Sequence, residues 1–327
     1  MPGIEIHPSI ANIVLEDVLA ASLRANRLDP KLLYVTPRQA ALWREVSLKH
    51  SPIHTNPEFS RIYRDAYDRI VERVRGKKVH LVGLGPGTGW KEAELAARLR
   101  SHGCEVEFTA IDASRDLVEE SAKRVVTTGA GDGRHLVCDL AELDFIKDWL
   151  DAKDRESPRL FTFFGLVPNL EPQFVTQLFS KLLRSDDALL VSVHLAPVDE
   201  GLDLEAAMKR VLPQYDNPET LAWLRTTMDY WKLGDFMEEP KIVAGERKDL
   251  PCIGGIAPWK SHEAYLKFAP DAGEFADVSF SLFFSLRYTP ALFEELLRQA
   301  GVRGERLAMT TCREEAIWEI RRADGVG

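Results

Sequence analysis

The stretch Val79-His80-Leu81-Val82-Gly83-Leu84-Gly85-Pro86-Gly87-Thr88-Gly89 joins an apolar run to a turn in which glycines alternate with other residues. A helical pattern over residues 90–99 follows at once, so the segment predicts a strand, a tight turn and a helix. Glycine has no Cβ, and its backbone can therefore turn sharply and let a ligand approach its N–H groups. A glycine turn alone is weak evidence of a nucleotide site, because many tight turns bind nothing.

Asp112 strengthens this interpretation because it ends a second strand-like run, residues 106–111. An acidic residue at that strand end can accept hydrogen bonds from both ribose hydroxyls of a nucleotide. The turn is not the phosphate loop G-x-x-x-x-G-K-[ST], because Lys91 is displaced and no Ser or Thr follows it. Its glycine spacing also departs from G-x-G-x-x-G. Alternating small residues with a proline instead resemble the first motif of methyltransferases that use S-adenosylmethionine (SAM).

Strand and helix patterns alternate from residue 78 onward. The predicted strands lie near residues 79–84, 105–111, 134–138, 159–165 and 187–195, and the predicted helices near 90–101, 115–127, 141–150 and 172–184. Such alternation predicts a parallel sheet covered by helices on both faces, the Rossmann-like α/β class. Ligands of these sheets bind at the carboxyl ends of the strands, where the sequence places Asp112, Asp139 and Asn169.

The two ends of the chain and a long insertion complete the predicted organisation. Helices are predicted near residues 10–25, 40–46, 58–75, 202–212, 217–232 and 290–300, and strands near 252–256, 263–269, 279–288, 302–310 and 316–320. The last two strands predict an antiparallel hairpin at the sheet edge. We expect residues 58–197 and 286–327 to form the cofactor-binding domain. Residues 1–57 and 198–285 are expected to form a substrate-binding lobe over the carboxyl edge of the sheet.

Composition limits the functional classes. The chain has 327 residues, 45% hydrophobic content and a formal net charge of −9, and it lacks a dense Lys/Arg block, so nucleic-acid binding is disfavoured. It shows no signal peptide and no apolar run near the roughly 18–20 residues of a membrane span. The scattered cysteines lack a C-x-x-C pair and no metal-ligand spacing stands out. We therefore expect a cytoplasmic monomer or homodimer that acts on a small molecule.

Four stretches together resemble the family of SAM-dependent methyltransferases that includes the histidine Nα-methyltransferases of ergothioneine biosynthesis and the fungal prenyltryptophan N-methyltransferases. The resemblance runs from about residue 32 to the end of the chain. The stretches are Leu32–Tyr34 with the loop Pro52–Pro57, Leu81–Thr88, Phe164–Leu170 followed by Pro172, and Phe280–Tyr288. The resemblance implies a Rossmann-like class I methyltransferase with SAM as its cofactor.

The resemblance also implies a role for each candidate residue. Asn169 is implied to hold the substrate amine and, with Tyr34, to take part in catalysis, while Ser285 matches a further substrate position. Asp139 would meet the adenine amino group or cap the following helix. The residues expected to line the ribose and methionine part of SAM are Gly85, Pro86, Gly87, Thr88 and Asp112.

Three positions depart from the family pattern. The family usually has an acid where this chain has Gly83, and that acid holds the amino group of the cofactor's methionine. The histidine enzymes show Ile-His-Thr-Glu-x-Ser-x-Lys-Tyr/Phe in the last stretch, where Ser281 replaces the His and Phe283 replaces the Glu. A phenyl ring accepts no conventional hydrogen bond and offers a large apolar face. We therefore expect methylation of an amine that is more apolar or aromatic than histidine.

Strict strand alternation places Ser281, Phe283 and Ser285 on one face of their strand, and Phe280 and Phe284 on the other. His54 and His194 are candidates for a general base, but a buried, hydrogen-bonded histidine is the favoured interpretation of each. The alternatives to an N-methyltransferase are an O-methyltransferase of a small metabolite, an NAD(P)-dependent oxidoreductase and a SAM-binding protein without catalysis.

Overall fold

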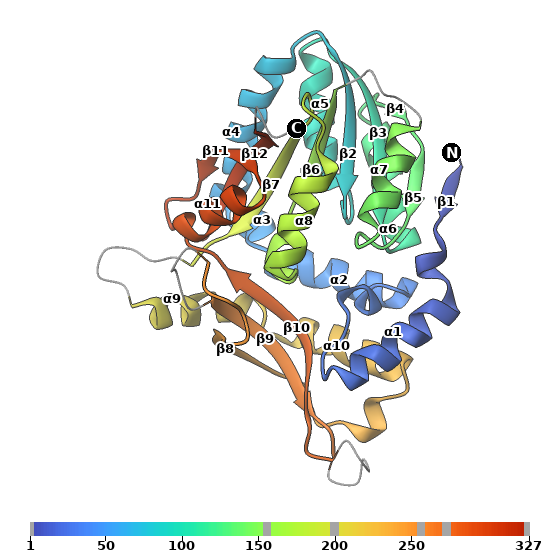
Figure 1. Cartoon of the computed structure of the whole chain (residues 1–327), viewed down its shortest axis with the longest axis vertical. Helices are drawn as coiled ribbons and strands as arrows, with labels where there is room; N and C mark the ends of the chain where they lie inside the picture. The colour runs from blue at the N-terminus through green and yellow to red at the C-terminus, as the bar shows by residue number, and fades with distance from the viewer. Residues whose placement is uncertain (1–2, 153–157, 197–202, 254–258, 270–275, 324–327) are drawn as a thin grey trace.

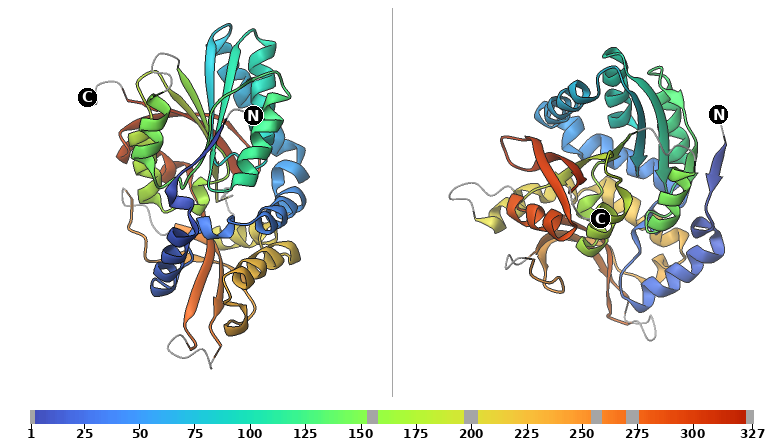
Figure 2. Two further views of the ribbon diagram at one scale, coloured as in Figure 1. Left: turned by 90° about the vertical axis from the view of Figure 1, so that its right-hand side faces the viewer. Right: turned by 45° about the horizontal axis from the view of Figure 1, so that its top comes forward.

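The computed structural model describes residues 3–152, 158–196, 203–253, 259–269 and 276–323. Within these residues, a nine-stranded sheet forms one end of the molecule and a three-stranded sheet the other (Figure 1). Helix α2 (Pro37–His50) lies between the arrowheads of the central strands and the smaller sheet. The left view of Figure 2, turned by 90°, shows the same two-part arrangement.

The large sheet has the predicted Rossmann-like α/β organisation. In spatial order its strands are β1 (Ile4–Ile6), β5 (His135–Val137), β3 (Glu105–Asp112), β2 (Lys78–Leu84), β6 (Arg159–Phe163), β7 (Ala188–His194), β12 (Glu315–Arg322) and β11 (Val302–Met309), with β4 (Gly131–Asp132) beside β3. All pairs from β1 to β7 are parallel. The antiparallel strand β12 pairs with β7 and with β11, which forms the edge. The chain leaves β2 toward β3 on one side and later reaches β6 on the other, so a topological switch point lies at the carboxyl end of β2.

Helices cover both faces of this sheet, as predicted, because its strands are apolar on both sides. Leu81 packs into the core that α4, α5 and α6 share, whereas the next residue, Val82, packs into the core of α7, α8 and α11. These helices are α4 (Pro57–Val74), α5 (Trp90–Ser101), α6 (Arg115–Val126), α7 (Leu143–Asp151), α8 (Pro172–Leu182) and α11 (Pro290–Gln299).

The N-terminal helices and the insertion share a third hydrophobic core. The antiparallel strands β8 (Lys241–Arg247), β9 (Trp259–Lys267) and β10 (Ser279–Arg287) form the small sheet in the order β10-β9-β8. Its helical partners are α1 (Asn12–Arg24), α2, α9 (Leu204–Val211) and α10 (Pro218–Tyr230). Leu15 of α1, Trp223 of α10 and Phe280 of β10 are buried together in this core. We refer to this part of the molecule as the lobe.

The structure differs from the predicted elements in the lobe and at the N-terminus. Strand β8 was not predicted, and the strand expected near 252–256 lies mostly outside the described residues. Pro52–Thr55, predicted as loop, forms the single-turn helix α3. Strand β1 is a three-residue edge strand that pairs in parallel with β5, more than a hundred residues away in the sequence. Such short strands depend on a distant partner, so a local pattern gives little signal for them.

Candidate active site

A cavity of about 770 Å³ lies between the carboxyl edge of the large sheet and the lobe. Typical small-molecule sites have volumes of roughly 300–1,000 Å³, so this cavity is large enough for a cofactor with a second small ligand. Nine of the ten predicted site residues line it: Tyr34, Gly85, Pro86, Gly87, Thr88, Asp112, Asp139, Asn169 and Phe283. The tenth, Ser285, is buried behind the wall and hydrogen-bonds the hydroxyl of Tyr215, which does line the cavity.

The glycine turn is held in place by neighbouring side chains. Gly85 and Gly87 have φ angles of +58° and +56°, values that L-residues with a side chain rarely adopt. A Cβ on Gly87 would lie 2.6 Å from the indole Cη2 of Trp43 in α2, and one on Gly85 would lie 2.2 Å from Cδ1 of Leu166. The absence of side chains at Gly85 and Gly87 therefore also lets Leu166 and Trp43 pack on the turn. The sequence did not indicate this packing.

Asp112 ends β3 with its carboxylate next to the turn. The residue is 8% exposed, and its carboxylate accepts hydrogen bonds from the backbone N–H groups of Gly87, Ala113 and Ser114. Burial raises the pKa of Asp112 to about 6, and the three N–H donors oppose that shift. The carboxylate is thus fixed in orientation at the edge of the cavity, as a ribose-binding group requires.

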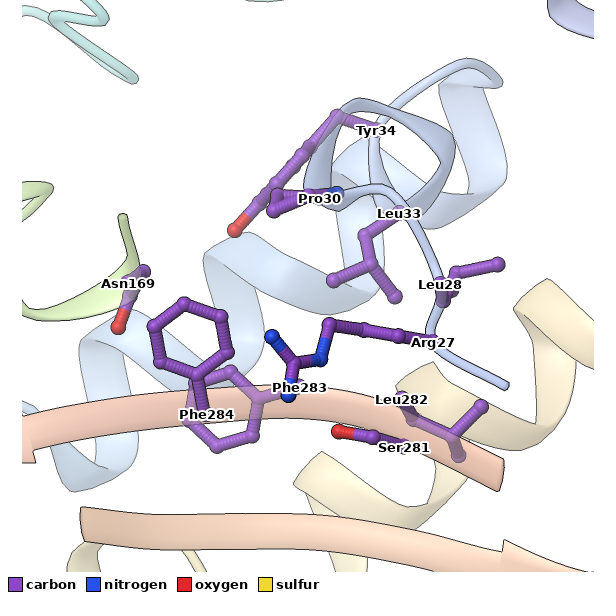
Figure 3. A pocket seen from close by; sticks show the side chains of 10 residues that line it. All are labelled: Arg27, Leu28, Pro30, Leu33, Tyr34, Asn169, Ser281, Leu282, Phe283 and Phe284. Atoms are coloured by element: carbon purple, nitrogen blue, oxygen red, sulfur yellow. The ribbon is translucent and has the colours of Figure 1, made fainter. Parts of the chain in front are cut away.

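Tyr34 lies between the turn and the lobe. Its ring centroid is 6.0 Å from that of Trp43 and 5.5 Å from that of Trp223. Desolvation and the nearby charge of Asp112 raise the pKa of Tyr34 far above its usual range, so the phenol stays neutral. Figure 3 shows its hydroxyl end directed toward the side on which Asn169 lies. Tyr34 therefore lies where the glycine turn, the lobe and the corner with Asn169 meet in the cavity.

Asp139 follows β5 and uses both carboxylate oxygens within the protein. Its Oδ1 accepts a hydrogen bond of 2.9 Å from the N–H of Ala141, and its Oδ2 forms an ion pair with Lys31 of the lobe. Asp139 therefore closes the turn before α7 but does not cap that helix as expected, because the N-cap position of α7 is Glu142. The ion pair also connects the sheet to the lobe at this end of the cavity.

A buried charged cluster, consisting of Lys91, Glu92 and Glu315, lines the cavity beyond the turn. The Lys91 ammonium lies 5.0 Å from the ring centroid of Tyr63, and the hydroxyl of Tyr63 donates a hydrogen bond of 2.5 Å to Glu315. Desolvation lowers the pKa of Lys91 and raises those of the two glutamates. The sequence analysis missed this cluster, although Lys91 and Glu92 begin the helix that follows the turn.

Both histidines considered as general bases line the cavity. His194 ends β7, and burial with the nearby charge of Arg287 keeps its pKa well below the usual range, so the imidazole is neutral. Its Nδ1 lies 3.5 Å from the Tyr215 hydroxyl. His54 packs with its ring centroid 5.4 Å from that of Trp90, and desolvation lowers its pKa as well. The geometry supports a hydrogen-bonded role for His194 as readily as a catalytic one.

The strand that carries Phe283 breaks the expected alternation. A β-bulge between Ser281 and Phe283 sets two residues of β10 against one of β9, so strict alternation does not hold there. The bulge reverses the facing of the residues after it relative to Phe280, and Phe284 lines the cavity, so the prediction that Phe284 points away from it was wrong. Phe283, Phe284 and Asn169 line the same corner of the cavity (Figure 3). Phe280 is fully buried in the core of the lobe, as the pattern predicted.

Asn169 ends a short 3₁₀ helix, Val167–Asn169, in the loop that follows β6. Among the described residues, its Nδ2 donates one long hydrogen bond of 3.5 Å, to the carbonyl oxygen of Gly165. The orientation of the side-chain amide therefore depends mainly on the backbone of the loop. The residue faces the same corner of the cavity as Phe283, Phe284 and Arg27 (Figure 3). It is well placed to contact an acceptor bound against the two rings.

The described residues contain neither a metal-binding cluster nor a membrane-spanning helix. No group of three or more His, Cys, Asp or Glu side chains within them is arranged to hold a metal ion. None of the helices described is long and apolar enough to cross a membrane.

Comparison with known proteins gives three results. DesVI from Streptomyces venezuelae is similar in structure, with a TM-score of 0.43 and 12% identity over 87% of this chain and 98% of its own. SAM-bound CalS10, an amino pentose methyltransferase from Micromonospora echinaspora, gives a TM-score of 0.38 and 12% identity over 80% of this chain and 92% of its own. At these values the structural likenesses carry no argument about the site. No curated protein matches the chain.

The sequence itself places the chain in a family. Residues 15–221, which include the N-terminal helices, the glycine turn, Asp112 and Asn169, match the family described as histidine-specific, SAM-dependent methyltransferases. This match extends over more than half of the chain, and Trp223, Phe283, Phe284 and Glu315 of the cavity wall lie outside it. The protein is therefore a SAM-dependent methyltransferase and belongs to the histidine-specific methyltransferase family.

Proposed function

We propose that the protein methylates the amino group of an apolar or aromatic amino acid, or of a related small amine, and that histidine is a poor acceptor. The observation that carries this proposal is the pair of phenyl rings, Phe283 and Phe284, on the cavity wall beside Asn169 (Figure 3). Phe283 stands at the position where the resembling histidine enzymes carry a carboxylate.

The sheet side of the cavity fits SAM. The oriented carboxylate of Asp112 can accept hydrogen bonds from ribose hydroxyls, and the turn from Gly85 to Thr88 offers bare backbone beside it. The Lys91 ammonium forms no ion pair or hydrogen bond in the described part of the chain, which suits it to the carboxylate of the methionine moiety. When bound, SAM supplies an electrophilic methyl group on its sulfonium.

The lobe side would desolvate and orient the acceptor. Apolar rings around an amine disfavour its charged form, and the neutral amine is the nucleophile that methyl transfer requires. The side-chain oxygen of Asn169 can accept a hydrogen bond from the amine and hold it in one orientation. Positioning of this kind can supply much of the rate enhancement without a strong base, because an amine needs less activation than an alcohol.

This corner offers little to an imidazole. Two guanidinium groups lie over the Phe284 ring, but Arg27 is paired with Glu171 at 2.7 Å, and Arg247 with Glu171 at 3.0 Å and Asp249 at 2.7 Å. The carboxylates of Glu171 and Asp249 are therefore already paired with arginines. An imidazole placed against the phenyl rings would lose hydrogen bonds to water without regaining them, and such losses disfavour polar ligands.

The test is a methyl-transfer assay with the purified protein, SAM and a panel of acceptors: tryptophan, phenylalanine, tryptamine, histidine and a phenol without an amine. We expect at least one aromatic amine to show a kcat/KM about tenfold or more above that of histidine. Product mass and fragmentation would place the methyl group on nitrogen. Histidine as the best acceptor, or transfer to the phenol alone, would overturn the proposal.

A further inference from the structure

Glu92 is a buried carboxylate with one oxygen unused. It lies in the first turn of α5, is 2% exposed and lines the cavity. Its Oε1 accepts a hydrogen bond of 2.9 Å from the hydroxyl of Thr162, whereas its Oε2 is buried and has no partner among the other described residues. Leaving a buried carboxylate oxygen unpaired is costly, so a donor from a ligand is the natural complement.

The place that Glu92 reaches is the carboxyl end of the central strand. Thr162 of β6 stands directly opposite Gly83 of β2 in the parallel ladder. Leu81 and Leu160, two residues earlier on each strand, both pack into the core shared with α5, so Gly83 and Thr162 face that helix too. Gly83 contributes no side chain there. The acidic group at this position is thus supplied by the helix instead of the strand.

Lys91 and Glu92 present opposite charges to the same cavity from consecutive positions. This pattern complements the zwitterionic head of an α-amino acid, which carries one ammonium and one carboxylate. The other buried or half-buried carboxylates on the wall already accept hydrogen bonds from protein groups: Asp29, Asp112, Asp139, Glu171 and Glu315. Glu92 is therefore the carboxylate best able to accept from a new donor.

We propose that Glu92 binds the α-ammonium group of the methionine moiety of SAM through Oε2. The inference rests on SAM binding by this family and deepens it, and it is independent of which amine accepts the methyl group. Thr162 acts as a positioning residue, because its hydroxyl holds Oε1 and leaves Oε2 directed to the ligand. The Thr162 hydroxyl does not itself reach the cofactor in this scheme.

The experiment compares two ligands by isothermal titration calorimetry. One is S-adenosylhomocysteine (SAH), and the other is 5′-S-(3-carboxypropyl)-5′-thioadenosine, which is SAH without its amino group. We expect the wild-type protein to bind SAH about tenfold or more tightly than the desamino compound, as a charge-assisted hydrogen bond implies. In Glu92→Gln this preference should fall to about twofold or less, while the affinity for the desamino compound stays near the wild-type value.

Glu94→Gln is the matched control, because Glu94 lies on the same helix and its carboxylate faces Arg98 at 3.6 Å. It should leave both affinities unchanged. An unchanged preference for SAH in Glu92→Gln would overturn the proposal, as would an equal loss of affinity for both ligands. Equal binding of the two ligands by the wild-type protein would overturn it as well, and that result needs no variant to fold. No acceptor is present, so the outcome does not depend on the proposed substrate.

Discussion

The two walls of the cavity differ in the groups that they present. The sheet wall presents charged side chains, such as Asp112 at the end of β3 and Lys91 at the start of α5. It also presents exposed backbone in the turn at Gly87. The lobe wall is dominated by rings, including Phe283, Phe284 and Trp223. A charged cofactor suits the first wall and an apolar acceptor suits the second. Trp223 and Phe283 pack in the core of the lobe, whereas Phe284 packs in a core of the large sheet, so the ring-lined wall is supported by both parts of the molecule.

The walls are nevertheless connected at several points. Trp43 of the lobe covers Gly87, Lys31 pairs with Asp139, and Arg44 pairs with Glu120 of α6 at 3.1 Å. Variants within one wall test whether that wall affects only cofactor binding or only acceptor choice. Variants at these contacts test whether a change in one wall alters the other.

The largest effect is expected from Asp112→Ala, in the sheet wall. Loss of two charged hydrogen bonds to ribose, each of about 1.5–3 kcal/mol, should weaken SAH binding on the order of 100-fold or more. Calorimetric titration measures this, with Asp144→Ala as the control, because the side chain of Asp144 is 79% exposed on α7. A folded Asp112→Ala protein with wild-type affinity for SAH would remove Asp112 from the cofactor site.

A contact between the walls can be isolated by comparing two glycines. Gly76 and Gly87 both have positive φ, +71° and +56°, so a Cβ strains either backbone by roughly 1–2 kcal/mol. No atom lies within 4 Å of a Cβ on Gly76, whereas one on Gly87 meets Trp43. Gly87→Ala should therefore lower the free energy of unfolding in urea by about 1–3 kcal/mol more than Gly76→Ala. Equal losses would mean that Trp43 moves aside without cost.

Phe283→Glu tests the lobe wall alone. A carboxylate against an apolar acceptor should lower kcat/KM for the preferred aromatic amine by about tenfold or more, because the charge must be desolvated without a partner. The affinity for SAH should change by about twofold at most, since Phe283 lies in the other wall. Phe283→Leu keeps an apolar side chain and should retain most of the activity. Loss of SAH binding in Phe283→Glu would show that the walls do not act separately.

The smallest effect concerns pH. In the proposed binding mode the ionised form of Asp112 accepts the ribose hydrogen bonds, and burial raises the pKa of this carboxyl to about 6. SAH affinity should thus be nearly constant above pH 7 and fall by about tenfold from pH 7 to pH 5 as the carboxylate is protonated. Asp112→Asn should lose the part of this dependence that is centred near pH 6. An affinity for SAH that rises on acidification would contradict the sign of this prediction.

The sheet wall was largely predictable from the sequence, whereas the details of the lobe were not. Gly85, Gly87 and Asp112 stand at the ends of apolar runs, and the carboxyl ends of parallel strands necessarily meet at one edge. The placement of Phe284 depends on a β-bulge in β10. The extra residue moves the side chains that follow it to the opposite face of the strand, and the local sequence gives no clear signal of a bulge.

Long-range pairing hid the remaining groups. Glu315 reaches the cavity because β12 runs antiparallel beside β7, which brings Glu315 opposite His194. Trp43 covers Gly87 from a helix of the other wall, and no periodicity in the sequence indicates that contact. Glu92 lies close to the turn in sequence, but its free oxygen became visible only when Thr162 was placed opposite Gly83.

The division between the walls is tested most directly by a crystal structure of the protein with SAH and its best acceptor bound. We predict the ribose on Asp112, the acceptor against Phe283 and Phe284, and its nitrogen beside Asn169 and facing the sulfur of SAH at a separation suited to in-line transfer. An acceptor bound away from the two rings, or rings covered by the adenosine, would contradict the assignment of acceptor choice to the lobe.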